Sequence, residues 1–224
     1  MKCKNIYISR HGVRPKQLPE WAEPCNEPYD GPAYDAPLAA MGRQQAEALA
    51  ESLKDIPLDF IFSSPFRRTI QTVVPLARAK GIPIKLEWGI GELLKESWFE
   101  TFPHLPSPAE RKLEFPEVDA RYQSAIIPNY PETIETLELR IAQTLSHLSE
   151  NYGPNIFLVG HGASTRGMRS VLLQNKEMTG LEFCSLCHIA RTDDSWQLTR
   201  DADVAHLIAK KIHVPYLLTR SATG

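Results

Sequence analysis

The chain has 224 residues, of which 42% are hydrophobic and 23% are charged, values ordinary for a soluble globular protein. This composition excludes a disordered or fibrous protein, and the length fits one domain with a substantial core. The formal net charge of -2 gives no overall attraction to nucleic acid or to an anionic membrane. We therefore expect one domain over residues 1–224, with no nucleic-acid or membrane partner and with any anionic ligand held by local charge.

The first five residues and the cysteines indicate the compartment. Residues 1–5 contain no apolar stretch long enough for a signal peptide or a membrane span, which predicts a cytoplasmic protein. The four cysteines, Cys3, Cys25, Cys184 and Cys187, are too few and too scattered for a disulfide scaffold, so free thiols are expected. Cys184 and Cys187 form a C-x-x-C pair, but a strand would place them on opposite faces. A structural role is therefore favoured over a zinc or redox site.

The first part of the chain alternates between strands and helices. Apolar runs predict strands, and apolar residues at helical spacing predict helices, over residues 6–9, 38–54, 58–62, 66–80 and 84–87. The second of these helices is closed by Gly81, followed by Pro83. Such alternation predicts an α/β fold with a mostly parallel central sheet covered by helices on both faces, that is, a three-layer α/β/α sandwich.

The second part continues the pattern with a long helix, an apolar strand, another helix and two paired strands, over residues 133–151, 156–159, 163–173, 183–192 and 196–200. The turn 193–195 separates the paired strands. The tail beyond Asp203 has apolar residues but no decisive signal.

Two segments interrupt this alternation and are rich in proline and aromatic residues. They cover about 13–37 and 89–131, and each contains six of the eighteen prolines, which prevents a regular helix over most of their length. A short helix is predicted within the second, over 107–114. Both insertions are candidates for bordering a substrate pocket, or they are simple surface excursions.

Chemically informative residues follow the predicted strands. The first strand ends at Arg10-His11-Gly12, and the strand over 156–159 ends at Gly160-His161-Gly162. Ser64-Pro65-Phe66-Arg67-Arg68 follows the second strand, and Glu92 lies beyond the third. Because the carboxyl ends of parallel strands meet at one sheet edge, these side chains should share one crevice.

In these motifs and their order the chain resembles the histidine phosphatase superfamily, also called the phosphoglycerate mutase-like family. The resemblance runs from Ile6 to about Leu173 and implies the phosphoglycerate mutase-like fold. Three segments are most similar to the branch of ecdysteroid-phosphate phosphatase and the suppressor of T-cell receptor signalling phosphatases, namely Arg10-His11-Gly12-Val13-Arg14, Tyr34-Asp35-Ala36-Pro37-Leu38 and Glu87-Trp88-Gly89-Ile90-Gly91-Glu92.

The resemblance implies that His11 attacks phosphorus and is transiently phosphorylated, with no cofactor and no metal. Because an imidazole must then attack an anion, fixed donors have to offset the charge of the phosphate. Arg10 and Arg68 are expected to supply planar forks to the phosphate oxygens, whereas Arg67 should point elsewhere if the segment is helical.

Three further site residues follow from the same resemblance. His161 is expected to bind the phosphate from the opposite side and, when protonated, to donate to developing charge. Arg14 matches an additional phosphate-facing arginine, and Glu92 matches the proton donor to the leaving group. These assignments give His11, Glu92, His161, Arg10 and Arg68 as catalytic residues, and Arg10, Arg14, Arg68 and His161 as substrate-binding residues.

Three functions remain open at this point. The first is a cofactor-independent phosphomonoesterase acting on a small-molecule or phosphopeptide substrate. The second is a phosphoglycerate mutase, although Val13-Arg14-Pro15 replaces the acidic, Ser and Asn positions usual after the first motif of mutases. The third is a weakly catalytic protein that binds a phosphorylated ligand. Metal binding by the histidines is disfavoured because neighbouring arginines would repel a cation.

Overall fold

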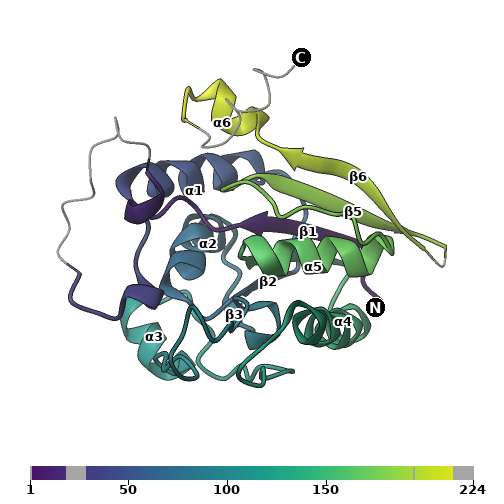
Figure 1. Ribbon diagram of the computed structural model, residues 1–224. Helices are drawn as coiled ribbons and strands as arrows, with labels where there is room; N and C mark the ends of the chain where they lie inside the picture. Colours follow the sequence, from purple (N-terminus) through teal and green to yellow (C-terminus); the bar gives the residue numbers. More distant parts are fainter. Residues whose placement is uncertain (1, 19–28, 194, 214–224) are drawn as a thin grey trace, which may run out of the picture.

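The computed structural model describes residues 2–18, 29–193 and 195–213. At its centre lies a six-stranded sheet in the order β3-β2-β4-β1-β5-β6 (Figure 1). The strands are β1 (Asn5–Arg10), β2 (Phe60–Ser63), β3 (Ile84–Leu86), β4 (Asn155–Gly160), β5 (Leu186–Thr192) and β6 (Ser195–Asp203). Strands β1 to β4 are parallel, and β5 and β6 add an antiparallel edge. The predicted mostly parallel sheet is confirmed.

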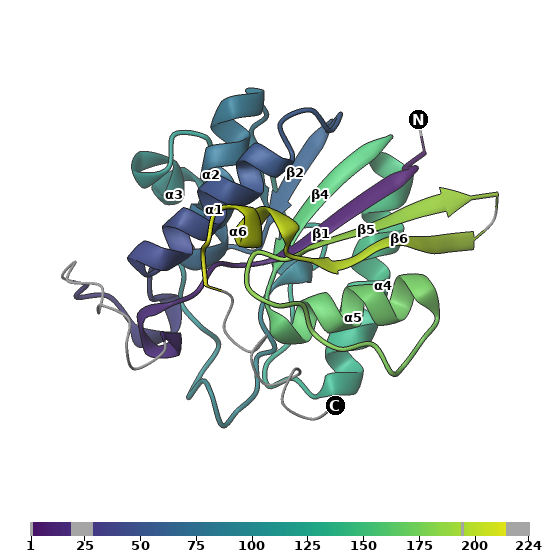
Figure 2. The same cartoon turned by 90° about the horizontal axis from the view of Figure 1, so that it is seen from above.

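Helices cover both faces of this sheet. They are α1 (Ala40–Ser52), α2 (Arg67–Lys80), α3 (Pro108–Glu114), α4 (Ile134–Asn151), α5 (Gly162–Leu173) and α6 (Ala205–Ala209), with 3-10 turns η1 (Pro15–Gln17), η2 (Ala33–Asp35) and η3 (Trp88–Ile90). Figure 2 shows α1 and α2 on one side of the strands and α4 and α5 on the other. The three-layer sandwich is therefore confirmed, whereas α6, which packs on α1, was not predicted.

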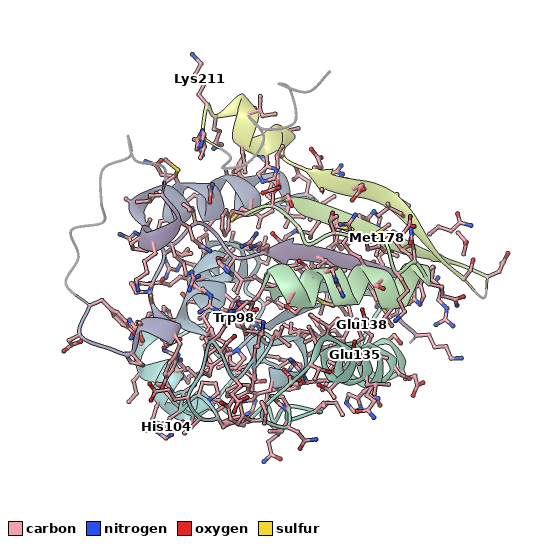
Figure 3. All side chains as sticks on the ribbon, in the orientation of Figure 1. Trp98, His104, Glu135, Glu138, Met178 and Lys211 are labelled. Atoms are coloured by element: carbon pink, nitrogen blue, oxygen red, sulfur yellow. The ribbon has the colours of Figure 1, made fainter. Side chains whose placement is uncertain are left out.

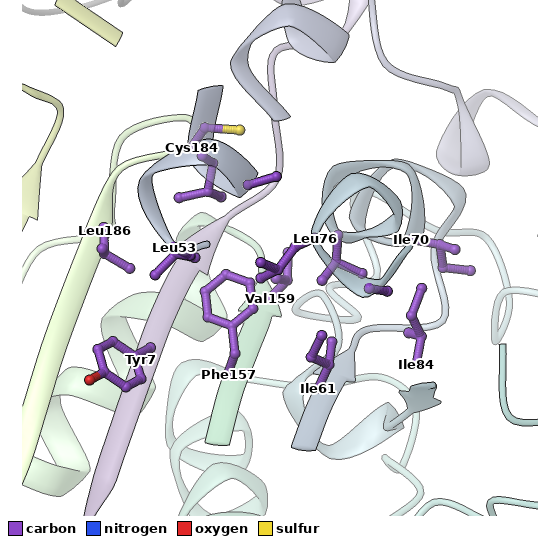
Figure 4. Packing of buried hydrophobic residues seen from close by; sticks show 14 of the residues in the cluster. Tyr7, Leu53, Ile61, Ile70, Leu76, Ile84, Phe157, Val159, Cys184 and Leu186 are labelled. Atoms are coloured by element: carbon purple, nitrogen blue, oxygen red, sulfur yellow. The ribbon is translucent and has the colours of Figure 1, made fainter. Parts of the chain in front are cut away.

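Alternation along the central strands divides the core into two layers. Tyr7 and Phe157 face α1 and α2 in one buried cluster, part of which is shown in Figure 4. Ile6, Ile8 and Leu158 face α4 and α5 in the other. Because β1 and β4 are buried on both faces, each contains a run of consecutive apolar residues, Ile6 to Ile8 in β1 and Ile156 to Val159 in β4, as parallel strands require.

The start of β5 corrects one prediction and supports another. The strand begins at Leu186 and not at Phe183, because Cys184 adopts a φ of 51° and Phe183 makes only an isolated bridge to Arg10. Cys184 and Cys187 nevertheless lie in different core layers as free thiols, so one ion could not bind both. Cys25 lies outside the described residues.

The two insertions meet beside the carboxyl edge of the sheet. Residues 19–28 of the first lie outside the described part of the chain. A hydrophobic cluster of Phe66, Leu94 and Phe99 packs against Tyr34 of the first insertion. Asp35 and Arg111, both buried, form an ion pair between the insertions. In the described residues, no helix combines the length and apolar character needed to cross a membrane.

Candidate active site

Sheet register brings the two histidine motifs together. Arg10 of β1 is paired with Gly160 of β4, and the His11 backbone N–H donates to the Gly160 carbonyl oxygen at 3.1 Å. His11 and His161 therefore follow their strands at the same level, with ring centroids 5.3 Å apart. Both imidazoles are buried. Backbone pairing between residues far apart in sequence thus sets the spacing of the two rings.

The hydrogen bond of His11 defines its tautomer. Its Nδ1 lies 2.7 Å from the carbonyl oxygen of Gly12, which can only accept, so Nδ1 carries the proton and Nε2 keeps its lone pair. Gly12 can adopt this position because it has no side chain: a Cβ there would lie 2.6 Å from the Gly42 carbonyl oxygen. Its N–H donates to Thr72 Oγ1 at 3.0 Å. The arrangement leaves an unprotonated Nε2 in a fixed orientation, which could act as a nucleophile.

Arg68, on the first turn of α2, links the other groups. Its Nη1 donates to the Tyr34 carbonyl oxygen at 2.7 Å, and its Nη2 lies 3.0 Å from His161 Nδ1 and 3.3 Å from Glu92 Oε2. Burial lowers the pKa of Arg68 to about 10, so the guanidinium remains charged at neutral pH. Because a guanidinium only donates, His161 Nδ1 is an acceptor and its Nε2 donates to Ser64 Oγ at 2.8 Å.

The remaining charges face a cavity of about 430 Å³ beside the histidines, lined by Arg10, Arg14, Gln17, Tyr34, Arg68, Glu92, Trp98, Phe99, Gly162 and Ala163. Arg10 stacks over Phe183, 3.9 Å from the ring centroid, and donates to the Leu181 carbonyl oxygen. Gln17 accepts from Arg14 Nε at 3.1 Å. The cavity therefore presents three guanidinium groups and one carboxylate.

Both imidazoles are neutral in the free protein. Burial, and then the positive charges of Arg68 and Arg10, hold the pKa of His11 well below its ordinary value of 6.5. Burial and Arg68 lower the pKa of His161 in the same way. A neutral His11 suits attack on phosphorus, whereas the protonated His161 expected from the sequence requires a bound anion to offset the arginine charges.

These lowered pKa values make stability depend on pH. In the unfolded chain the imidazoles have ordinary pKa values, so below about 6.5 the unfolded state binds more protons than the folded state. The free energy of unfolding should therefore decrease as the pH falls through 6.5, with a slope that approaches about 1.4 kcal/mol per pH unit for each imidazole once the unfolded chain is fully protonated. Urea unfolding of wild type and His11→Asn between pH 7 and 5 measures this contribution; equal slopes for the two proteins would contradict it. Burial also lowers the pKa values of His188 and His206, but both proteins contain these residues. The difference between the two slopes therefore excludes the contributions of His188 and His206 to the pH dependence of stability.

The fold brings together all six residues expected from the sequence, namely Arg10, His11, Arg14, Arg68, Glu92 and His161. Arg67 points away, as expected, and pairs with Glu114. Ser64 and Tyr34 lie within quoted motifs, but their contacts were not foreseen. Among residues 2–18, 29–193 and 195–213, no group of three His, Cys, Asp or Glu side chains is placed to hold a metal ion.

The family model described as the histidine phosphatase superfamily (branch 1) matches residues 6–204, so the chain belongs to this superfamily. The resemblance read from the motifs is confirmed at that level.

Individual relatives bear different names. The chain is 36% identical over 190 residues to the transcription factor tau 55 kDa subunit of Saccharomyces cerevisiae, covering 77% of this chain but only 42% of that protein. It is 26% identical over 218 residues to a probable phosphoglycerate mutase of Shigella dysenteriae, covering 91% of this chain and 95% of the relative. Its fold resembles the ecdysone phosphate phosphatase of Bombix mori, crystallised with tungstate, with a TM-score of 0.69, 18% identity, and coverage of 89% and 93% of the two chains.

Proposed function

We propose that the protein is a phosphomonoesterase that works through a phosphohistidine on His11. The observation that carries this proposal is the fixed tautomer of His11, whose unprotonated Nε2 belongs to a neutral imidazole beside the guanidinium groups of Arg10 and Arg68. A nucleophile next to a cavity that is lined by fixed cations and a carboxylate provides the groups that phosphoryl transfer requires.

In the first step His11 Nε2 forms a bond to phosphorus while the bond from phosphorus to the ester oxygen breaks. Arg10, Arg14 and Arg68 balance the negative charge on the phosphoryl oxygens. Glu92, in its protonated form, gives its proton to the departing oxygen, which leaves as an alcohol or phenol. His161 is proposed to contact the same phosphoryl group. The negative charge of the bound phosphate favours the protonated form of its imidazole.

In the second step water attacks the phosphohistidine. The Glu92 carboxylate takes a proton from this water, and the bond from phosphorus to Nε2 breaks to release inorganic phosphate. Both Glu92 and the imidazole of His11 return to their starting states. No cofactor enters either step.

A test on two substrates separates phosphatase from mutase. We expect release of phosphate from p-nitrophenyl phosphate, and little isomer exchange when 3-phosphoglycerate is supplied with a bisphosphoglycerate primer. Efficient exchange with little free phosphate would establish the mutase instead. Arg14, in place of a substrate-holding acidic, Ser or Asn residue, supports the phosphatase.

The aromatic residues in the wall of the cavity favour a substrate with an aryl or other bulky leaving group, which includes a phosphopeptide. Trp98, labelled in Figure 3, lines the cavity and is 57% exposed, beside the buried Phe99. We expect Trp98→Ala to raise KM for phenyl phosphate by about tenfold, the equivalent of about 1.4 kcal/mol of lost aromatic contact. KM for glycerol phosphate should change little. Equal changes in both KM values would exclude a leaving-group contact at Trp98.

The 36% sequence identity with the yeast transcription factor subunit favours a second candidate function, in which the protein is a subunit of a transcription-factor assembly. We expect a tagged chain, purified from its own cells, to bring with it the other subunits of such a factor, with or without His11. Recovery of the chain by itself under gentle conditions would contradict this function and leave the first proposal intact.

A further inference from the structure

A buried ion pair contacts the backbone that carries Glu92. Arg140 of α4 is 4% exposed, and Glu132, just before this helix, is 5% exposed. Arg140 Nε donates to Glu132 Oε1 and Arg140 Nη2 donates to Glu132 Oε2, both at 2.7 Å. Such a bidentate contact fixes the plane of the guanidinium.

The other donors of Arg140 reach the ends of the turn before Glu92. Its Nη1 donates to the Trp88 carbonyl oxygen at 2.7 Å, and its Nη2 donates to the carbonyl oxygen of Glu92 itself at 3.1 Å. Glu132 Oε2 in turn accepts from the backbone N–H of Leu94 at 3.0 Å. The ion pair therefore contacts the chain on both sides of the Glu92 side chain.

Close packing leaves this turn little freedom. A Cβ on Gly89 would lie 2.0 Å from Thr144 Oγ1, and one on Gly91 would lie 2.8 Å from the Trp88 carbonyl oxygen. Thr144 lies one turn after Arg140 on the same helix, and its hydroxyl donates to the Arg140 carbonyl oxygen. The backbone from Trp88 to Glu92 is thus seated directly on α4.

We propose that Arg140, held by Glu132, is a positioning residue for the proton donor Glu92. Its contacts are with backbone carbonyl groups and with Glu132, so it acts on the reaction through the place it gives to the Glu92 carboxylate. A proton donor must lie within hydrogen-bond reach of the departing oxygen, and a displacement of about 1 Å removes much of its effect. The inference rests on the role of Glu92 in the proposed function.

Leaving-group dependence provides the test. Phenol departs less readily than p-nitrophenol, so hydrolysis of phenyl phosphate depends more strongly on proton donation. In Arg140→Met we expect kcat/KM for phenyl phosphate to fall about tenfold more than kcat/KM for p-nitrophenyl phosphate, part of the rate contribution that general acids supply. Glu92→Gln should show the same selective loss to a greater extent.

Two further variants address folding and specificity. Arg140→Met leaves Glu132 buried without its partner, so the double variant Glu132→Gln/Arg140→Met, which removes both charges, is measured beside it. Arg166→Met is the matched control: Arg166 of α5 pairs at 3.2 Å with Glu138, labelled on α4 in Figure 3. In this control variant, kcat/KM for each of the two substrates should stay close to the wild-type value.

The outcomes separate the two levels of inference. Equal losses on both substrates in Arg140→Met and in the double variant, with a selective loss in Glu92→Gln, would overturn the positioning role alone. An equally selective loss in Arg166→Met would overturn it as well. Equal losses on both substrates in Glu92→Gln, or no hydrolysis by wild type, would overturn the role of Glu92 and with it that of Arg140.

Discussion

His11→Ala is expected to slow hydrolysis of p-nitrophenyl phosphate by about 10⁴-fold or more, the scale on which loss of a covalent nucleophile slows other enzymes. The alanine leaves the arginines in place but removes the only atom that forms the bond to phosphorus in the proposed reaction. Rapid quenching under alkaline conditions, in which a phosphohistidine survives, should trap label from a radioactive substrate on wild type and not on the variant.

A surface histidine serves as the control for this experiment. His147, exposed on α4, should be replaceable by alanine without loss of turnover or of trapped label. Retention of label by His11→Ala would mean that another side chain receives the phosphoryl group, with His161 as the first to be examined.

Arg68→Met is expected to lower kcat/KM by about 10³-fold, the upper range for removal of one fixed donor to a developing oxyanion. After burial, the positive charge of Arg68 is the largest cause of the lowered pKa of both imidazoles. The pKa of His161, followed by NMR titration, should therefore rise toward its ordinary value in the same variant. A merely structural effect would lower activity without moving this pKa.

The neighbouring arginine offers a matched comparison. Arg67→Met alters the same turn of α2 but removes a contact with Glu114 on the molecular surface, so activity should stay close to that of wild type. Arg68→Lys should restore little of the activity lost in Arg68→Met. An ammonium lacks the planar fork of a guanidinium, so it cannot donate to the Tyr34 carbonyl oxygen and to a phosphate at the same time. Equal losses in Arg67→Met and Arg68→Met would contradict a specific role of Arg68.

Much of this fold could be predicted because its signals are local. Strands that are buried on both faces appear as apolar runs in the sequence, and amphipathic helices appear as apolar residues at helical spacing. Gly81 ends α2 with a φ of 66°, as its position predicts. The short helix α6 was missed because five residues hold too few turns for a periodic pattern. The start of β5 was placed too early because the turn at Cys184 depends on packing against β1.

The residues of the candidate site likewise fall into those that the sequence predicts and those that depend on tertiary packing. Residues at strand ends, such as His11 and His161, could be predicted because parallel topology places them at one edge. Backbone contacts such as that of Tyr34 with Arg68 leave no mark on residue type. Arg140 did leave one: it lies between Leu137 and Ile141 in the apolar stripe of α4, where a charged side chain requires a buried partner.

The pairing of Arg10 with Gly160 has a consequence for how such an enzyme can diversify. Arg10, His11 and His161, which we propose act on the phosphate, lie at or just after the ends of central strands, where a displacement would disturb some of the most protected hydrogen bonds of the molecule. Trp98, which lines the cavity and which we propose contacts the leaving group, belongs to an insertion outside the sheet. On this proposal, substitutions in the insertion would change which alcohol or phenol the protein accepts while the phosphate-binding groups stay the same, so substrate preference could evolve separately from the chemical step.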